Sequence, residues 1–200
     1  MSTKVDGVEI KGDLKPGFDE ILTNDALNFV AKLHRNFNER RLQLLEERAK
    51  RQKRLDAGER PDFLESTRHI REYNNWTIGK LPKDLLRRRF EITGPPEKKM
   101  IINAFNSGSD AYMCDFEDSN TPNWINQIQG QINLKQAIRR QLNFMDEKGK
   151  EYKLNEKIAT LSVRPRGWHL SEKHVIIDGK RTSGSLLDFG LFLFHNAKEQ

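Results

Sequence analysis

The spacing of apolar residues in the first third of the chain predicts one long amphipathic helix. Apolar side chains recur there at intervals typical of a helical face, at Leu27, Val30, Leu33, Phe37 and Leu44. Asn24 suits the N-terminal cap of such a helix, while Gly58 and Pro61 suit its end. We therefore expect a helix from about residue 25 to 57, preceded by an irregular segment with a short strand at Val8–Ile10.

The segment that follows is also expected to be mainly helical. Asp62 and Glu65 have the spacing of a helix-capping pair, which predicts a short helix over residues 63–72. A turn that starts near Lys80 is expected to bury Leu85 and Leu86.

Beyond residue 87 the pattern changes to strands alternating with helices. Apolar alternation predicts strands at 90–93, 111–116 and 158–163, and helices at 97–106, 133–144 and 186–196. Asp178-Gly179 marks a hairpin, and Lys148-Gly149-Lys150 marks another turn. This order is typical of an α/β barrel or a doubly wound sheet. The expected domains are a helical one over residues 1–86 and an α/β one over residues 87–200.

The α/β part is too short for a closed barrel. A (β/α)₈ barrel needs about 250 residues, so the chain from residue 87 onward has room for about three βα units. The last predicted helix carries Phe192, Leu193 and Phe194, which need a sheet to cover. We therefore expect a fragment of a longer protein, or a domain completed by another chain.

Candidate chemistry lies at the ends of two predicted strands. The strand at 111–116 runs into MCDFEDS, where Asp115 and Glu117 share one face in strand geometry and Asp118 points away. Two carboxylates so placed suit Mg²⁺, directly or through water, and could equally clamp an arginine. A solvated loop with no such role is the alternative.

The strand at 158–163 is expected to be buried. It overlaps the start of TLSVRPRGWHL, residues 160–170, which continues beyond the strand as a charged and aromatic turn. Arg164 and Arg166 alternate across Pro165, so both can face one side and grip a carboxylate with two N–H groups. They could bind an anionic substrate at the mouth of a barrel, or form a structural ion pair with Asp115 or Glu117. The two roles are compatible.

The remaining reactive side chains predict little chemistry. His169 and His174 lie five residues apart, which is not the spacing of a helical metal pair. His195 is expected to be a packing residue on an apolar helix. Cys114 is expected to be a small buried residue rather than a nucleophile, because no histidine is adjacent to it in sequence.

Composition and charge narrow the class of protein. A net charge of +6, 36% hydrophobic residues and 32% charged residues predict a soluble chain. No stretch is long and apolar enough to span a membrane, and the N-terminus lacks the apolar core of a signal peptide. One cysteine allows no internal disulfide and suits the cytoplasm. The basic run at 48–54 is interleaved with acids, which favours a solvated helix face over nucleic-acid binding.

The strings DFEDS, RPRGWHL and FHN, in this order, resemble those of the A-type malate synthase family of the glyoxylate cycle. The resemblance runs from about Phe63 to Ala197, through RRRFEITGPPEKKMIINAFNSGSDAYMCDFEDSNTPNW, GQINL and SGSLLDFGLFLFHNA. It implies an N-terminal helical clasp over residues 1–86 and a TIM-barrel enzyme. Residues 87–200 would then form about three βα units of a barrel that is incomplete in this chain.

The resemblance also implies an acyltransferase reaction. The family condenses acetyl-CoA with glyoxylate, with Mg²⁺, to give malate and CoA. Arg164 matches the first arginine of the family's motif and would stabilise the enolate, while Asp115 and Glu117 would help to place Arg164 and the metal. Cys114 stands where alanine is usual. The family's metal ligands and catalytic base lie beyond the matched region, so we expect these 200 residues alone to be inactive.

Two other functions stay open from the sequence. One is a citrate-lyase β-like acyl-CoA lyase, which has a similar acid strand and arginine strand. The other is a non-enzymatic, basic helical RNA-binding module that rests on residues 48–54. The expected setting is the cytoplasm, or the peroxisome or glyoxysome in a eukaryote, without a membrane or nucleic-acid partner. The sequence leaves open whether the protein is a monomer or a homo-oligomer.

Overall fold

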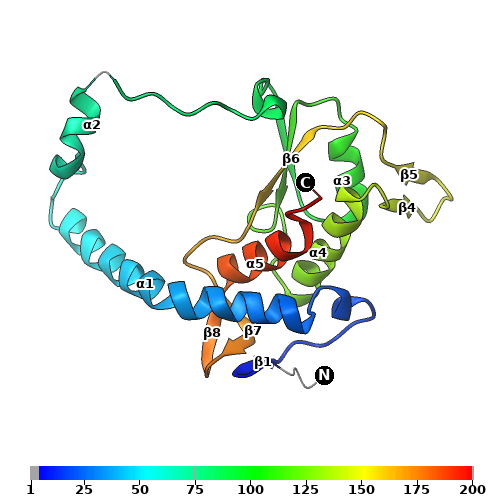
Figure 1. The fold of residues 1–200 in the computed structure, drawn as a ribbon, viewed down its shortest axis with the longest axis horizontal. Coiled ribbons are helices and arrows are strands. Elements are labelled where there is room, and N and C mark those ends of the chain that lie inside the picture. Colours follow the sequence, from blue (N-terminus) through cyan, green and yellow to red (C-terminus); the bar gives the residue numbers. More distant parts are fainter. Residues whose placement is uncertain (1–4, 74, 200) are drawn as a thin grey trace.

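The computed structural model describes residues 5–73 and 75–199, so the outermost ends of both predicted domains lie outside it. Figure 1 shows a body built from two small sheets and their helices, from which one long segment extends away. The α/β class expected from the sequence is confirmed. No helix among the described residues combines the length and the hydropathy that a membrane span requires.

The N-terminal part contains a short strand, β1 (Val8–Ile10), a 3₁₀ turn, η1 (Phe18–Glu20), and the long helix α1 (Asn24–Asp56). The strand and the helix are confirmed, but the cap is Thr23 rather than Asn24. The Thr23 side-chain oxygen accepts a hydrogen bond from the Ala26 N–H at 3.2 Å, which satisfies a free donor of the first turn.

Only the first half of α1 contributes to the core. Its buried side chains end at Arg41, whereas Phe37 is 50% exposed and Leu44 is 42% exposed. The apolar pattern therefore predicted the helix correctly, but not how much of it packs. Gly58, at φ 97°, has the left-handed conformation expected just past the helix end.

The segment after α1 makes short helical turns. η2 (Glu65–Thr67) and α2 (Arg68–Glu72) lie away from the body (Figure 1), whereas η3 (Lys83–Leu85) contacts it, since the Thr160 hydroxyl donates to the Asp84 oxygen at 3.2 Å. The short helix expected at 63–72 is confirmed in its second half. The capping role of Asp62 is wrong, because among the residues that the structure describes its carboxylate accepts only from the adjacent Phe63 N–H, at 2.7 Å. The burial expected for Leu86 is also wrong, since this side chain is 68% exposed.

The central feature is a parallel sheet of three strands: β2 (Glu91–Gly94), β3 (Ala111–Asp115) and β6 (Thr160–Arg164), in the order β2-β3-β6. The register pairs Gly94 with Cys114, and Asp115 with Arg164. All three strands agree with the predicted ones to within about two residues. Because the strands are parallel, their carboxyl ends meet at one edge.

Helices α3 (Lys98–Phe105) and α4 (Trp124–Ile138) pack on one face of this sheet. The core there joins Tyr112, Cys114 and Phe116 of alternate strand positions to the helices. On β6, Leu161 and Val163 are only partly buried. The expectation that this strand is buried is therefore wrong, because β6 pairs on one side only within the described residues.

Helix α4 differs most from the prediction of a helix at 133–144. It starts nine residues earlier because the Asn123 side chain caps it, accepting from the Asn126 N–H at 2.9 Å. Its polar residues Gln127 and Gln131 are buried and donate to the backbone oxygens of Phe116 and Asp188. The chain then forms a hairpin of β4 (Asn143–Met145) and β5 (Glu151–Lys153), which confirms the expected turn.

The second sheet is antiparallel and joins the two ends of the chain. Strand β7 (Ser171–Ile177) pairs with β1 on one side and with β8 (Lys180–Ser183) on the other. Asp178 and Gly179 have φ values of 50° and 75°, as the predicted hairpin requires. Helix α5 (Gly184–Asn196) then packs against α1. The division of the chain near residue 86 stays a prediction.

Candidate functional site

The carboxyl ends of β3 and β6 bring the predicted acids and Arg164 together. Register places Asp115 opposite Arg164. The guanidinium Nη1 lies 3.5 Å from Oδ2 of Asp115, and Nη2 lies 2.9 Å from Oε2 of Glu117. Nη2 also lies 2.6 Å from Oδ2 of Asp118, and this hydrogen bond raises the pKa of the guanidinium. The arginine is therefore fixed in its charged form by three carboxylates.

Asp115 builds the turn that follows β3. Its side chain is 1% exposed, and Oδ1 accepts from the Glu117 N–H at 2.9 Å. Oδ2 accepts from the N–H and the Oγ–H of Ser119 at 3.0 and 3.1 Å. Because this turn begins at Asp115, the side chains after it no longer alternate between the two faces of the strand. The expectation that Asp118 points away from its neighbours is therefore wrong, since its carboxylate reaches Arg164.

Glu117 joins the loops that follow β3 and β6. Its Oε2 accepts from Arg164, and its Oε1 accepts from the Gly167 N–H at 3.0 Å. A Cβ atom on Gly167 would overlap Oε1 of Glu117, so the contact depends on glycine at this position. Two loops that are 50 residues apart in sequence are thereby held as one surface around Arg164.

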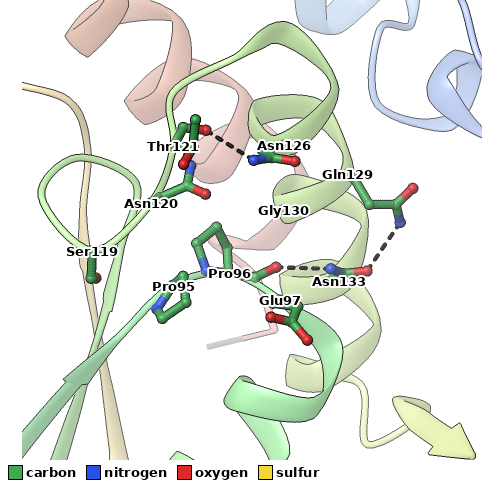
Figure 2. A pocket seen from close by; sticks show the side chains of 10 residues that line it. All are labelled: Pro95, Pro96, Glu97, Ser119, Asn120, Thr121, Asn126, Gln129, Gly130 and Asn133. Carbon is green, nitrogen blue, oxygen red and sulfur yellow. Dashed lines mark hydrogen bonds between the residues drawn. The ribbon is translucent and has the colours of Figure 1, made fainter. Parts of the chain in front are cut away.

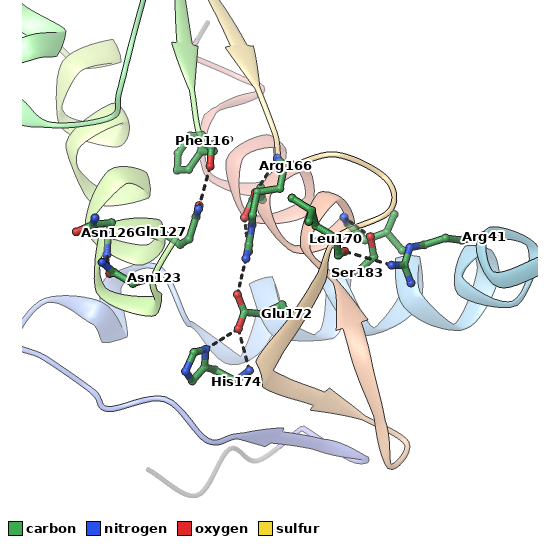
Figure 3. A network of polar contacts seen from close by, with 12 residues as sticks. Arg41, Phe116, Asn123, Asn126, Gln127, Arg166, Leu170, Glu172, His174 and Ser183 are labelled. Atoms are coloured by element: carbon green, nitrogen blue, oxygen red, sulfur yellow. Dashed lines mark hydrogen bonds and ion pairs between the residues drawn. The ribbon is translucent and has the colours of Figure 1, made fainter. Parts of the chain in front are cut away.

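Arg166 takes a different direction from Arg164, so the expectation that both arginines face one side is wrong. Its side chain is 4% exposed. Nε and Nη2 donate to Asp188 at 2.9 and 2.8 Å, and Nη1 donates to Glu172 at 2.6 Å (Figure 3). The strand ends at Arg164, so the alternation of side chains between its two faces does not continue through Pro165. Arg166 is part of a buried ion-pair network.

The network extends from Arg166 to His174. Oε1 of Glu172 accepts from the His174 N–H at 2.8 Å and lies 2.6 Å from its ring Nδ1. Burial of Glu172 opposes ionisation, but the hydrogen bonds from Arg166 and His174 outweigh it and lower the pKa of this carboxyl. The sequence had given His174 no role, because nothing local predicts that its partner Glu172, two residues before it, is in turn held by Arg166.

Two other reactive side chains have packing environments, as expected. Cys114 is fully buried, and burial raises the pKa of its thiol to about 12, which leaves it uncharged at neutral pH. His195 approaches the backbone oxygen of Ile21 at 2.8 Å through Nε2, and burial lowers the pKa of its ring.

The acids at the end of β3 do not form a metal site by themselves. Within residues 5–73 and 75–199, no group of three His, Cys, Asp or Glu side chains is placed to hold a metal ion. The oxygens of Asp115 and Glu117 are already occupied by Arg164 and by N–H and O–H donors.

A polar cavity of about 280 Å³ adjoins the Arg164 cluster at the same edge of the sheet (Figure 2). Asn133 closes its base by donating to the Pro96 oxygen at 2.8 Å, and Ser119 links its wall to Asp115. Sequence patterns gave no sign of it, because its walls come from three separate segments. The lining residues are Pro95, Pro96, Glu97, Ser119, Asn120, Thr121, Asn126, Gln129, Gly130 and Asn133.

The chain matches two family models in sequence. Residues 6–69 match the malate synthase N-terminal domain, and residues 160–200 match the malate synthase TIM barrel domain. It is 58% identical to a malate synthase of Myxococcus xanthus over 194 residues, which are 97% of this chain and 36% of that protein.

Eukaryotic relatives agree with this match. A glyoxysomal malate synthase of Candida tropicalis is 50% identical over 98% of the chain and 36% of its own length. A bifunctional glyoxylate cycle protein of Caenorhabditis elegans is 53% identical over 91% of the chain and 19% of its own length. The chain thus spans about a third of the length of the malate synthases that it matches. The chain belongs to the malate synthase family.

Proposed function

We propose that a protein containing this chain condenses acetyl-CoA with glyoxylate and water to give malate and CoA. One observation supports this most directly. In a chain of this family, an arginine and a cluster of carboxylates meet at the carboxyl ends of adjacent parallel strands. That edge is where barrel enzymes place their catalytic groups.

Arg164 is the catalytic residue of the proposal. A base from outside these 200 residues takes a methyl proton of acetyl-CoA, and negative charge develops on the thioester oxygen. The resulting enolate carbon bonds to the aldehyde carbon of glyoxylate, whose C=O double bond opens so that its oxygen takes up a proton, and water then hydrolyses the thioester to release CoA. Arg164 is suited to stabilise the enolate oxygen, because its orientation is fixed before the reaction.

The guanidinium retains donors for a substrate. Within the described part of the chain, both of its hydrogen bonds use Nη2 and none uses Nε. The side chain is 38% exposed, so an anionic oxygen can reach it. Arg166 lacks this capacity because it is buried, with Nε and both Nη atoms engaged by carboxylates.

Charge balance is the physical reason to include Mg²⁺ in the proposal. One arginine faces three carboxylates, so the cluster is formally negative, and a glyoxylate anion would be repelled from it. A divalent cation would restore the balance. Its ligands are expected outside this chain, and Asp115 and Glu117 would stay near it as supports of Arg164 rather than as its main ligands.

The proposal includes further strands that complete a barrel. Within the described residues, β2 and β6 each pair on one side only. Thr93 and Ser162 are exposed on the face opposite the Tyr112 and Cys114 side chains that contact the helices. Large apolar side chains of the segment between α1 and β2 are exposed as well, among them Phe63, Trp76 and Phe90. These surfaces suit coverage by more of the protein.

The other functions open from the sequence have less support. Family membership favours malate synthase over a citrate-lyase β-like enzyme. The basic run of α1 is partly neutralised, since Lys50 pairs with Glu46 and Glu47, and Arg51 pairs with Glu59. That arrangement favours a solvated helix face over an RNA-binding surface. A cytoplasmic or glyoxysomal location stays a prediction.

The test is Arg164→Lys in the complete protein that contains this chain. Lysine keeps the charge but loses the planar fork, so kcat for CoA release should fall by about 10²-fold or more. Arg87→Lys is the matched control, because Arg87 is 70% exposed and pairs with Asp110 just before β3. An unchanged kcat would refute the role of Arg164. CoA release by residues 1–200 alone, dependent on both substrates, would refute the outside location of the base.

A further inference from the structure

A second buried arginine, Arg41 of α1, is unusual in having no acidic partner. The residue is 2% exposed, and burial lowers the pKa of its guanidinium. Within the described residues, no carboxylate lies within ion-pair distance of it. A buried charge is costly unless other groups compensate it, so the groups around Arg41 need an explanation.

The compensation comes mainly from one loop of the barrel part, and Nη1 of Arg41 also donates to Oδ1 of Asn38 on the same helix at 3.1 Å. Nη2 of Arg41 donates to the Leu170 oxygen at 3.2 Å (Figure 3). Nε donates to the Trp168 oxygen at 2.6 Å, and Nη2 also donates to the Ser171 Oγ at 3.2 Å. A longer contact of 3.4 Å reaches the His169 oxygen. Three successive carbonyls thus converge on a single guanidinium, which is 127 to 129 residues away in sequence.

This loop, residues 165–170, connects Arg164 to β7. Its first half is fixed by the Gly167 N–H on Glu117 and by Arg166 on Asp188. Its second half is held by Arg41 and by the Gly184 N–H on the Leu170 oxygen, at 2.9 Å. Loss of Arg41 would leave the carbonyls of Trp168 and His169 without the donor that now satisfies them.

The contacts form a continuous path to the proposed catalytic arginine. Arg41 fixes the Trp168–Leu170 backbone, and Gly167 precedes it in the same tight turn, since the Leu170 N–H donates to the Gly167 oxygen at 3.0 Å. The Gly167 N–H in turn orients Glu117, which accepts from Arg164. An aliphatic residue at position 41 could fill the space but could not hold this turn.

We propose that Arg41 is a positioning residue of the active site, through which the N-terminal helix sets the loop after β6 and thereby the orientation of Arg164. Its effect on turnover rests on the proposed function, whereas its effect on the order of the loop does not. The fork geometry of arginine is required, because five acceptors at different angles share one side chain.

The experiment compares Arg41→Met and Arg41→Lys in the complete protein, with Arg40→Met as the control. Arg40 is an exposed neighbour on the same helix, and its guanidinium donates to the side chain of Gln43. Amide hydrogen exchange of Gly167 and Leu170 should accelerate about 10- to 100-fold in Arg41→Met, and less in Arg41→Lys. Exchange within β3 and α4 should stay unchanged, and Arg40→Met should match the unmodified protein.

Steady-state kinetics then tests the effect on catalysis. Both Arg41 variants should lower kcat by about tenfold or more, with the KM for acetyl-CoA changed less than about twofold, as for an interaction made in the transition state. Equal acceleration of exchange in β3 and α4 would overturn the proposal, since it would show only general destabilisation. Unchanged exchange in the loop, or an unchanged kcat, would overturn it too.

The two proposals can fail separately. If the unmodified complete protein releases no CoA, the proposed function fails, and the exchange measurement still decides whether Arg41 orders the loop. If Arg41→Met does not fold, Arg41→Lys decides. Lysine retains a charge but offers an ammonium in place of the fork, so its loop amides must still exchange faster than those of the unmodified protein.

Discussion

The sharpest test of the fold beneath the site is the removal of Arg166. This arginine lies between two buried carboxylates, with side-chain hydrogen bonds of 2.9 and 2.8 Å to Asp188 and 2.6 Å to Glu172. Arg166→Met keeps an unbranched side chain but leaves both acids buried without their cation. Asp188→Asn is the informative comparison, because it removes one negative charge and retains the pair of Arg166 with Glu172.

The expected losses follow from the charges that remain. Removing one partner of a buried ion pair lowers the free energy of unfolding by about 3–5 kcal/mol, and Arg166→Met should fall at the upper end because two like charges remain close together. Asp188→Asn should lose about 1–3 kcal/mol, since a neutral amide oxygen can still accept from Arg166. The difference between the two variants tests charge balance rather than packing.

Urea unfolding followed by far-UV circular dichroism measures both variants. The loss in Arg166→Met should be smaller near about pH 5 than at about pH 7, because an unpaired buried carboxyl takes up a proton more readily. The double variant Arg166→Met/Asp188→Leu should recover part of the loss. If Arg166→Met proves no more destabilising than Asp188→Asn at neutral pH, the network is not governed by charge balance and this reasoning is wrong.

Gly167→Ala should break the contact between the Gly167 N–H and Glu117, lowering the free energy of unfolding by about 1–3 kcal/mol and the kcat of the complete protein. Gly79→Ala, where an added Cβ meets no atom within 4 Å, should leave both unchanged. Because the pKa of Glu172 is lowered from 4.5, its contribution to stability is present above that pH and is lost as the pH falls through the lower folded value. Urea unfolding across this pH range should show the fall in the free energy of unfolding, and the fall should be smaller in Glu172→Gln. An equal dependence of stability on pH in both proteins would contradict the assignment of this loss to Glu172.

Local sequence signals predicted much of the fold. The three parallel strands follow from short apolar runs, and the hairpin follows from Asp178-Gly179, whose turn needs no distant partner. Helix α4 was misplaced because Gln127 and Gln131 look like exposed residues in the sequence. Their burial depends on carbonyls of Phe116 and Asp188 that only the folded chain brings near.

The same limit applies to the site. The meeting of Asp115 and Arg164 could be predicted, because strand ends in a parallel sheet share an edge. Arg41 could not, because its helix position favours a solvated side chain and its acceptors lie more than 120 residues away in sequence. A long-range contact to a backbone oxygen leaves no pattern in the sequence of either segment.

The contrast between Arg164 and Arg166 shows which property separates a binding arginine from a structural one. Arg164 ends β6 and Arg166 lies two residues beyond it, and both face more than one carboxylate. Arg166 is saturated, because Nε and both Nη atoms are engaged by acids in a space that excludes water. Arg164 donates hydrogen bonds through Nη2, pairs with Asp115 at the longer distance of 3.5 Å through Nη1, and is partly exposed, so it keeps donors for an anion while its orientation is fixed. The unused donors of a positioned guanidinium, rather than its place in a motif, are therefore what make Arg164 the candidate for catalysis.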